Sequence, residues 1–308
     1  MKSKYTRLSV CFLLVIFVLT GCRSSKTDTI RHDSSKKEEI KMPDSGEYIP
    51  GEDGCNTCLL DQVETAVVPD GEGYYFNNNG SLCYYDGKTD KTVYVCSKPD
   101  CRHVMYDDSC DAYIAGAINM LYYYKNNLYS VSRDNDSSKG TTGLVLTRIS
   151  ADASEREELY CFIHCLDSES VTFSCYVHRG YLYYSVANSD AEKKKKVRLY
   201  RRALKKDAPE EAVYETEGYY TGIDRITAYG NYLYLEETGF RKPGEEENYS
   251  ELLKYNIHTR EVETLTEDQY GICVKVKNHL YTMDKDRKMI IRFSEDGKDK
   301  KNCIRWRI

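Results

Sequence analysis

The residues with the clearest capacity for chemistry are three cysteines and one histidine in a short polar stretch. Cys96, Cys101, His103 and Cys110 follow the spacing Cys-x4-Cys-x-His-x6-Cys. Three thiolates and an imidazole can close a tetrahedral zinc site, so this set could hold a structural metal ion. Alternatively, two of the thiols form a disulfide and His103 stays on the surface, or all three thiols stay free. The stretch has little hydrophobic periodicity, and a loop of about fifteen residues needs a cross-link to stay ordered.

The cysteine count bears on these alternatives. The chain has 13 cysteines, and setting aside Cys11 and Cys22 in the amino-terminal segment leaves 11, an odd number. At least one must therefore stay unpaired, bind metal or pair between chains. The same ambiguity attaches to Cys55-x2-Cys58 and Cys161-x3-Cys165. An oxidising compartment favours disulfides, and Cys-x4-Cys is not a standard zinc-knuckle spacing, so we expect a disulfide ahead of a metal site and no other cofactor.

Signatures of catalysis are absent from the sequence. It has no Gly-x-Ser-x-Gly elbow, phosphate-binding loop, His-Glu-x-x-His or dinucleotide fingerprint. Carboxylates are plentiful, so a paired acid/base site is unsupported by motif and not excluded by count. Lys and Arg number 44 against 49 Asp and Glu, a formal charge of −5, which argues against a nucleic-acid partner. These observations favour a non-enzymatic role.

The amino-terminal residues predict export and lipid anchoring. Residues 1–7 carry three positive charges and no acid, and an uncharged run extends from Leu8 to Gly21. This run is shorter than the about 20 residues of a membrane span but suits the apolar region of a signal peptide. It ends Leu19-Thr20-Gly21-Cys22, which resembles the lipobox of bacterial lipoproteins, in which the cysteine after the cleavage site is diacylglycerylated. The alternatives are a plain secretory signal or an uncleaved anchor helix.

This reading divides the chain into three parts. Residues 1–21 are expected to be a lipoprotein signal peptide, with Cys22 the lipidated residue that holds the protein to the extracytoplasmic face of the cell membrane. Residues 22–60 are expected to be a flexible tether, because residues 23–53 contain few apolar side chains. Residues 61–308 form the folded domain and are long enough to bury a core.

The folded part is organised as a repeat with the two-residue period of β-strands. An apolar or aromatic residue followed by tyrosine recurs at intervals of 54, 54, 51 and 47 residues, at Tyr74-Tyr75, Leu128-Tyr129, Leu182-Tyr183, Leu233-Tyr234 and Leu280-Tyr281. Polar turns precede four of these steps, at Lys125-Asn126-Asn127, His178-Arg179-Gly180, Tyr229-Gly230-Asn231 and Lys277-Asn278-His279. Asn and Gly tolerate the positive φ of tight turns, so each unit is predicted to open with a hairpin.

A second pair of short strands follows in each unit, as in Leu82–Tyr85 with Thr92–Val95. Four strands in about 50 residues, repeated in series, are typical of β-propeller blades. A single four-stranded sheet cannot bury both faces, so neighbouring blades must share a core. We predict an all-β fold, a β-propeller of about five four-stranded blades, whose 29 tyrosines pack within and between the sheets.

A family resemblance supports this prediction. The Leu-Tyr steps and the endings Lys254-Tyr255-Asn256 and Arg292-Phe293-Ser294 resemble bacterial propellers of unknown function related to the low-density-lipoprotein-receptor type. The segment Cys96–His103 is similar to one in lipoproteins of that group. The resemblance covers about residues 65–300 and implies an extracytoplasmic repeat domain, commonly with more blades. Because the tail Lys300–Ile308, which contains Trp306, shows neither a clear fourth strand nor a sixth unit, we expect an open or truncated ring.

The long insertions predict which side of the domain binds a partner. They fall between the second and third strands of their units, at Ser132–Gly143, Val186–Lys196 and Glu236–Tyr249, and carry net charges of 0, +2 and −3. Insertions on one face of a repeat protein often mark its binding side. The run Lys193–Lys196 is interpreted as a solvated loop tip. We expect a binding module for a protein or glycan; the rivals are a glycan-active enzyme with a carboxylate pair in the propeller funnel and an envelope scaffold.

Overall fold

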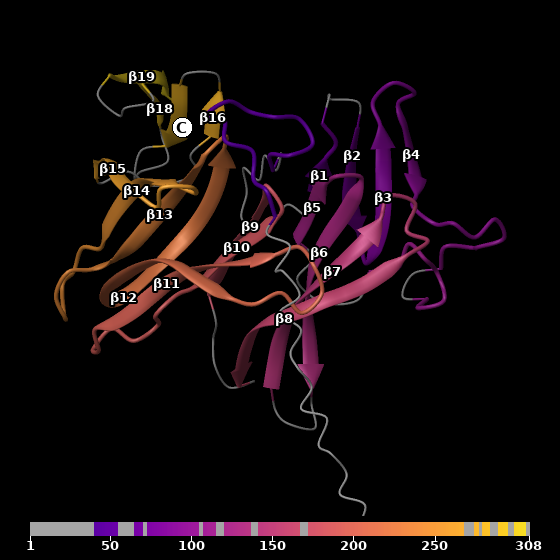
Figure 1. Ribbon diagram of the computed structural model, residues 1–308, viewed down its shortest axis with the longest axis horizontal. Coiled ribbons are helices and arrows are strands. Elements are labelled where there is room, and N and C mark those ends of the chain that lie inside the picture. Colours follow the sequence, from indigo (N-terminus) through magenta and orange to yellow (C-terminus); the bar gives the residue numbers. More distant parts are fainter. Residues whose placement is uncertain are drawn as a thin grey trace, which may run out of the picture. The chain divides into compact units, whose positions relative to one another are not determined.

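The computed structural model describes eleven segments of the chain: residues 40–54, 65–69, 73–104, 107–114, 120–136, 141–166, 172–267, 274–276, 279–283, 289–294 and 299–305. Its regular elements are the strands β1 to β19 (Figure 1). No helix long and apolar enough to cross a membrane is found in these segments. The predicted signal peptide, Cys22, Cys55, Cys58 and Trp306 lie outside the described residues.

The first two units are four-stranded antiparallel sheets whose strands follow chain order. Unit 1 consists of β1 (Thr65–Val67), β2 (Gly73–Asn78), β3 (Ser81–Asp86) and β4 (Lys91–Tyr94). Unit 2 consists of β5 (Met120–Tyr124), β6 (Asn127–Asp136), β7 (Thr141–Ser150) and β8 (Arg156–Leu166). The predicted four-strand repeat is therefore confirmed here, including the second strand pairs.

Units 3 and 4 share one long strand, which the sequence pattern did not predict. Unit 3 contains β9 (Phe173–His178), β10 (Tyr181–Val186) and β11 (Lys195–Ala203), and unit 4 contains β13 (Tyr232–Phe240), β14 (Tyr249–Asn256) and β15 (Val262–Glu267). Strand β12 (Glu211–Tyr229) pairs with β11 through its first half and with β13 through its second half (Figure 1). It is thus the fourth strand of unit 3 and the first strand of unit 4.

Unit 5 contains β16 (Val274–Val276), β17 (His279–Met283), β18 (Met289–Ser294) and β19 (Lys300–Arg305). The expectation that the tail lacks a fourth strand was wrong, because β19 pairs antiparallel with β18 from Phe293–Lys300 to Met289–Arg305. Its side chains alternate too weakly to signal a strand, and the pairing is made by the backbone. The described strands therefore form three four-stranded antiparallel sheets and one seven-stranded sheet, in which units 3 and 4 share β12. This series of four-stranded units is the β-propeller architecture, while the expectation of an open or truncated ring stays a prediction.

The predicted tight turns are confirmed where they are described. Lys125 and Asn126 have φ of 47° and 60° between β5 and β6, and Arg179 and Gly180 have φ of 45° and 82° between β9 and β10. Two successive residues with positive φ match the right-handed twist of the paired strands, as in type I′ hairpins. The turn at residues 277–278 lies outside the described segments.

Neighbouring sheets share buried side chains, as a repeat of incomplete units requires. One core cluster joins unit 1 to unit 2 and includes Leu82, Leu121 and Leu128, each 0% exposed. A second cluster joins unit 4 to unit 5 and includes Tyr234 and Leu280. The first strand of a unit contacts the first strand of the next, in the pairs β1 with β5, β5 with β9 and β9 with β12. The tyrosines largely pack as predicted, although Tyr74, Tyr94 and Tyr220 are exposed.

The insertions are less loop-like than the sequence suggested. In units 2 and 4 much of each insertion lengthens the strands, so that β6 reaches Asp136 and β13 reaches Phe240. In unit 3 the connection between second and third strands is irregular throughout residues 187–194, and in unit 4 the residues between the lengthened strands, 241–248, are irregular too. The run Lys193–Lys196 is exposed, as expected, and its lysines form ion pairs with Asp190, Glu215 and Glu217.

Candidate metal centre

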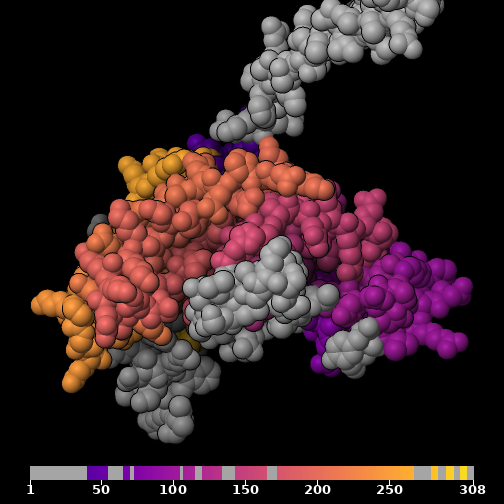
Figure 2. Space-filling view, turned by 90° about the horizontal axis from the view of Figure 1, so that it is seen from below, coloured from indigo at the N-terminus to yellow at the C-terminus, as the bar shows by residue number. Residues whose placement is uncertain are grey.

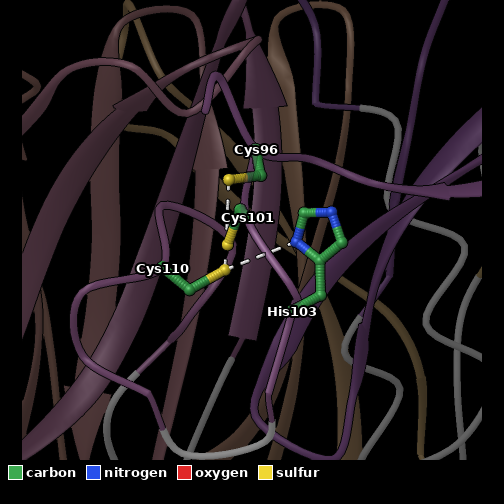
Figure 3. Close-up of side chains that lie close together, drawn as sticks. All are labelled: Cys96, Cys101, His103 and Cys110. Carbon is green, nitrogen blue, oxygen red and sulfur yellow. Dashed lines mark hydrogen bonds between the residues drawn. The ribbon is translucent and has the colours of Figure 1, made fainter. Parts of the chain in front are cut away.

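The four predicted ligands converge in the connection between β4 and β5. The Sγ atoms of Cys96, Cys101 and Cys110 and one ring nitrogen of His103 all lie within 4.8 Å of one another (Figure 3). The Sγ atom of Cys110 is 4.0 Å from that of Cys96 and 3.6 Å from Nδ1 of His103. Cys110 is buried and the other three are partly buried. The structure therefore brings together every residue of the predicted cluster.

The backbone fastens both ends of this loop to unit 1. At its start, the amide of Val95 donates to the carbonyl of Leu82 at 2.9 Å. At its end, the amide of Leu82 donates to the carbonyl of Ala112 at 2.6 Å, and Ile114 donates to Gly80 at 2.8 Å. Inside the loop, Cys110 donates to Asp107 at 3.0 Å in a tight turn. The loop that contains the cysteines is thus hydrogen-bonded at both ends to β3 and to the turn that precedes it.

Charged side chains brace the same loop. Lys98 forms an ion pair with Asp111 at 3.0 Å and donates to the carbonyl of Ser109, and Ser97 donates to Asp111 at 2.5 Å. Arg156, which begins β8 of unit 2, donates to the carbonyls of Asp111 and Tyr113. Two cations therefore lie against the carbonyl-rich second half of the loop. Purple atoms of the segment that carries it reach the surface in Figure 2.

The imidazole of His103 is held in place by its backbone and by an aromatic neighbour. The residue has a positive φ of 51°, which non-glycine residues adopt rarely. Its ring stacks on Tyr94, with the centroids 4.7 Å apart and the planes inclined by 20°. This contact orients the ring, and the nitrogen Nδ1 faces Cys110.

The surroundings shift the pKa values of Cys96 and Cys110 in opposite directions. Burial raises the pKa of Cys110 to about 11, and a hydrogen bond with Cys101 adds to the effect. Burial also acts to raise the pKa of Cys96, but backbone amides of Lys98 and Asp111 donate to its sulfur and bring its pKa below the usual value. The thiol of Cys96 is therefore the more acidic of the two.

The cluster cysteines are free thiols in the structure, as are Cys83, Cys175 and Cys303. The disulfide that we expected first and the metal site that we expected second both stay predictions. Of the other ambiguous pairs, Cys161 has its sulfur 3.5 Å from Nδ1 of His164, and the side chain of Cys165 lies outside the described residues.

Sequence reasoning missed a second polar site, which holds the amino-terminal part of the domain. We call residues Pro43–Gly54 the N-terminal strap. Arg179, 0% exposed, donates through Nε to Asp53 at 2.6 Å. Its remaining donors reach Asn231 and the carbonyls of Pro43, Ser45 and Glu47. The strap belongs to the segment expected to be a flexible tether, and here it is bound to the sheets.

Two more contacts lock the strap against the strand turns. The carboxylate of Asp53 also accepts from the amide of Gly230 at 2.9 Å. Gly230 has a φ of +58°, and a Cβ atom there would lie 2.3 Å from the carbonyl oxygen of Gly46, so only glycine fits. The amide of Gly54 donates to Nδ1 of the buried His178 at 3.2 Å. In the sequence His178-Arg179-Gly180 signalled only a turn, and no local pattern pointed to its distant partners.

One buried carboxylate elsewhere, that of Glu237, is satisfied by hydroxyl donors. Glu237, 5% exposed, accepts from Thr216 at 2.6 Å, Tyr249 at 2.9 Å and Tyr214 at 2.9 Å. Three donors occupy both carboxylate oxygens, which is the arrangement of a structural carboxylate. The neighbouring Glu236, which alternates to the other face of β13, faces Arg225 at 3.7 Å.

The chain is similar to known proteins only at the level of solved structures. No family model and no curated protein matches the chain. Among solved structures, it is similar to a chain of the nidogen/laminin complex, with 10% identity over 77% of this chain and 76% of that chain and a TM-score of 0.42. It is also similar to the α-L-arabinofuranosidase Arb93A from Fusarium graminearum, with 11% identity over 84% and 86% and a TM-score of 0.48. At these identities the likeness is one of fold alone.

Proposed function

We propose that the protein is an extracytoplasmic, lipid-anchored, non-enzymatic interaction module that presents one edge of its sheets to a protein or glycan. Anchoring rests on the lipobox-like sequence at Cys22. The finer assignment to the low-density-lipoprotein-receptor type of propeller, suggested by the Leu-Tyr steps, belongs to the same proposal. The observation that carries the choice of edge is the binding of the N-terminal strap to strand turns.

The strap contacts turns that all lie at one edge of the sheets. In an antiparallel sheet, the turns between first and second strands and between third and fourth strands share an edge. Glu52 pairs with Lys125 at 2.7 Å in the first turn of unit 2, and the buried Arg179 is in the first turn of unit 3. In unit 4, Pro43 accepts from His258, in the turn between third and fourth strands, at 3.1 Å. The strap, which leads back toward Cys22, therefore occupies this edge.

The opposite edge holds the features that vary between units. It carries the connections between second and third strands, with the lengthened hairpins of units 2 and 4 and the irregular connection of unit 3. The connection from β4 to β5, with the cysteines and His103, lies at the same edge. We infer that this edge, which we call the hairpin edge, faces a partner. Its mixed charges suit a polar surface and favour no nucleic acid.

The competing functions have less support. A glycan-active enzyme would need an acid and a base within reach of one bond. The buried Glu237 is saturated by three hydroxyl donors, so it does not offer such a group. An envelope scaffold would need an apolar face that repeats from unit to unit. The exposed large apolar residues of the described segments do not repeat in this way: four lie in unit 1 and the connection after it, and the others are Tyr220 on β12 and Val262 on β15.

Anchoring is tested on the full chain with Cys22→Ser, using Cys11→Ser as the matched cysteine control. We expect the wild type and Cys11→Ser to incorporate labelled fatty acid and float with liposomes, and Cys22→Ser to do neither. Lipidation of Cys22→Ser would overturn the anchor.

The edge is tested separately, in liposomes that carry a quencher on the lipid headgroups. A fluorescent amino acid replaces either Lys242, on the hairpin edge, or Thr259, on the strap edge; both are exposed and belong to unit 4. We expect stronger quenching at position 259. Equal or reversed quenching in protein that still floats would reject the proposed edge without rejecting the anchor.

A further inference from the structure

We propose that Cys96, Cys101, His103 and Cys110 form a structural binding site for one zinc ion, which pins the connection between β4 and β5 to the hairpin edge. The inference does not depend on lipid anchoring or on the identity of a partner. It rests on the positions of the four donor atoms and on the way the loop is fastened (Figure 3).

Two separations of the donor atoms, both measured from Cys110, lie close to those of a tetrahedral site. With Zn–S bonds of about 2.3 Å and Zn–N bonds of about 2.0 Å, tetrahedral angles place two sulfurs about 3.8 Å apart and a sulfur and a nitrogen about 3.5 Å apart. The corresponding distances from Cys110 are 4.0 Å to Cys96 and 3.6 Å to His103. All the donor atoms lie within 4.8 Å of one another, so the sulfurs need to approach one another by about 1 Å at most to close around a metal ion.

The number of donors distinguishes a metal site from a disulfide. A disulfide would use two of the three sulfurs and leave the third sulfur and the imidazole joined at most by a hydrogen bond, such as that between Cys110 and His103 at 3.6 Å. A zinc ion uses all four donors, and four protein ligands make a closed, structural site with no open position for a reactant. The ring of His103, which stacks on Tyr94 and points Nδ1 toward Cys110, serves as a ligand only in the second arrangement.

The surroundings also suit the charge of such a site. Three thiolates and one imidazole around a divalent cation leave a net charge of −1. Lys98 lies in the loop and Arg156 binds its carbonyls from unit 2, so two cations stand beside the ligands. The loop between the ligands contains no strand in its described residues, and the ion supplies the cross-link that such a loop needs.

The experiment compares metal binding by the full chain and three variants, purified without chelator. Cys101→Ser and His103→Ala each remove one ligand, and Cys303→Ser is the control, because Cys303 is an exposed free thiol in β19. Elemental analysis measures zinc per chain, and titration with Co²⁺ reports thiolate ligation through its charge-transfer and d–d bands. Circular dichroism in the far ultraviolet shows that each variant retains its β-sheet.

We expect one zinc ion per chain, bound on purification or after addition of Zn²⁺, in the wild type and in Cys303→Ser. In Cys101→Ser and His103→Ala the cobalt affinity should fall by at least about tenfold, since even partners outside the ligand set cause losses of this size. Equal metal binding by the folded ligand variants would overturn the proposal. So would a wild type that binds no metal, or a disulfide between any two of the three cysteines that excludes it.

Discussion

The carboxylate of Asp53 accepts a hydrogen bond from Nε of Arg179 at 2.6 Å, although 126 positions separate the two residues. Both side chains are 0% exposed. The guanidinium has a partner for every one of its donor nitrogens, which is the condition under which a buried cation is tolerated. This pair binds the strap to the first turns of units 3 and 4, so residues far outside the repeat are part of its stability.

Asp53→Asn should destabilise the domain strongly. The amide has the shape of the carboxylate but no charge, so Arg179 stays buried without a counterion, a change that costs about 3–5 kcal/mol. The matched control is Asp44→Asn, because Asp44 is exposed and receives only a hydrogen bond from Asn231. Urea unfolding measures both. A loss below about 1 kcal/mol for Asp53→Asn would show that the pair contributes little.

Stability should fall as the pH drops below about 6.5, because of His178. Burial lowers the pKa of His178 to about 4; Asp53 acts to raise it and Arg179 to lower it further. The neutral ring accepts from Gly54 at Nδ1 and donates from Nε2 to the carbonyl of Gly230 at 2.8 Å. Between pH 6.5 and 4 the unfolded chain binds a proton that the folded chain does not, so stability is complete above pH 6.5 and is lost at about 1.4 kcal/mol per pH unit.

The measurement is the free energy of unfolding from pH 8 to 4.5 in the wild type and in His178→Asn. We expect the acid-side slope to become flatter in the variant, although the variant is less stable at every pH. His258→Asn, a change at an exposed histidine, should leave the slope as it is. An unchanged slope in His178→Asn would assign the acid sensitivity to other groups.

Glu237→Gln should destabilise unit 4. Its carboxylate accepts from Tyr214, Tyr249 and Thr216, and the amide nitrogen of glutamine cannot accept from any of them. One or more buried hydroxyls then lose a partner, at about 1–3 kcal/mol. Glu246→Gln, at an exposed position in the β13–β14 connection, is the control and should change the melting temperature little. Equal effects of the two changes would contradict the structural role of Glu237.

Removal of metal should loosen one loop and leave the strap unchanged. If zinc pins the cysteine loop, a chelator with a mild reductant should raise amide hydrogen exchange in residues 96–104 and 107–114. Peptides that contain residues 43–54 should keep their protection, because Asp53 and Arg179 hold the strap independently. Cys303→Ser should respond as the wild type does. Unchanged exchange in the loop after zinc is removed would show that the ion does not order it.

The sequence was sufficient to predict the local organisation of the domain. Alternating apolar residues and paired positive-φ turns, such as Lys125-Asn126, are properties of neighbouring residues, so most strands of the five units could be located from them. The cysteine cluster was also visible, since its members lie within 15 residues and a loop so short keeps them close. The fourth strand of unit 5 was missed because β19 is recognised by its backbone pairing with β18 and not by its side chains.

The sequence by itself determined the repeat, its turns and the membership of the cysteine and histidine cluster, because these depend on spacing along the chain. Only the tertiary structure decided that β12 serves two units, that the four donors of the cluster converge within 4.8 Å of one another, and that Asp53 and Arg179 are partners. Each of these depends on which residues, far apart in the sequence, pack against one another and exclude water. A buried charge is tolerated only where the packing of the chain places a partner beside it, and that packing depends on the whole chain.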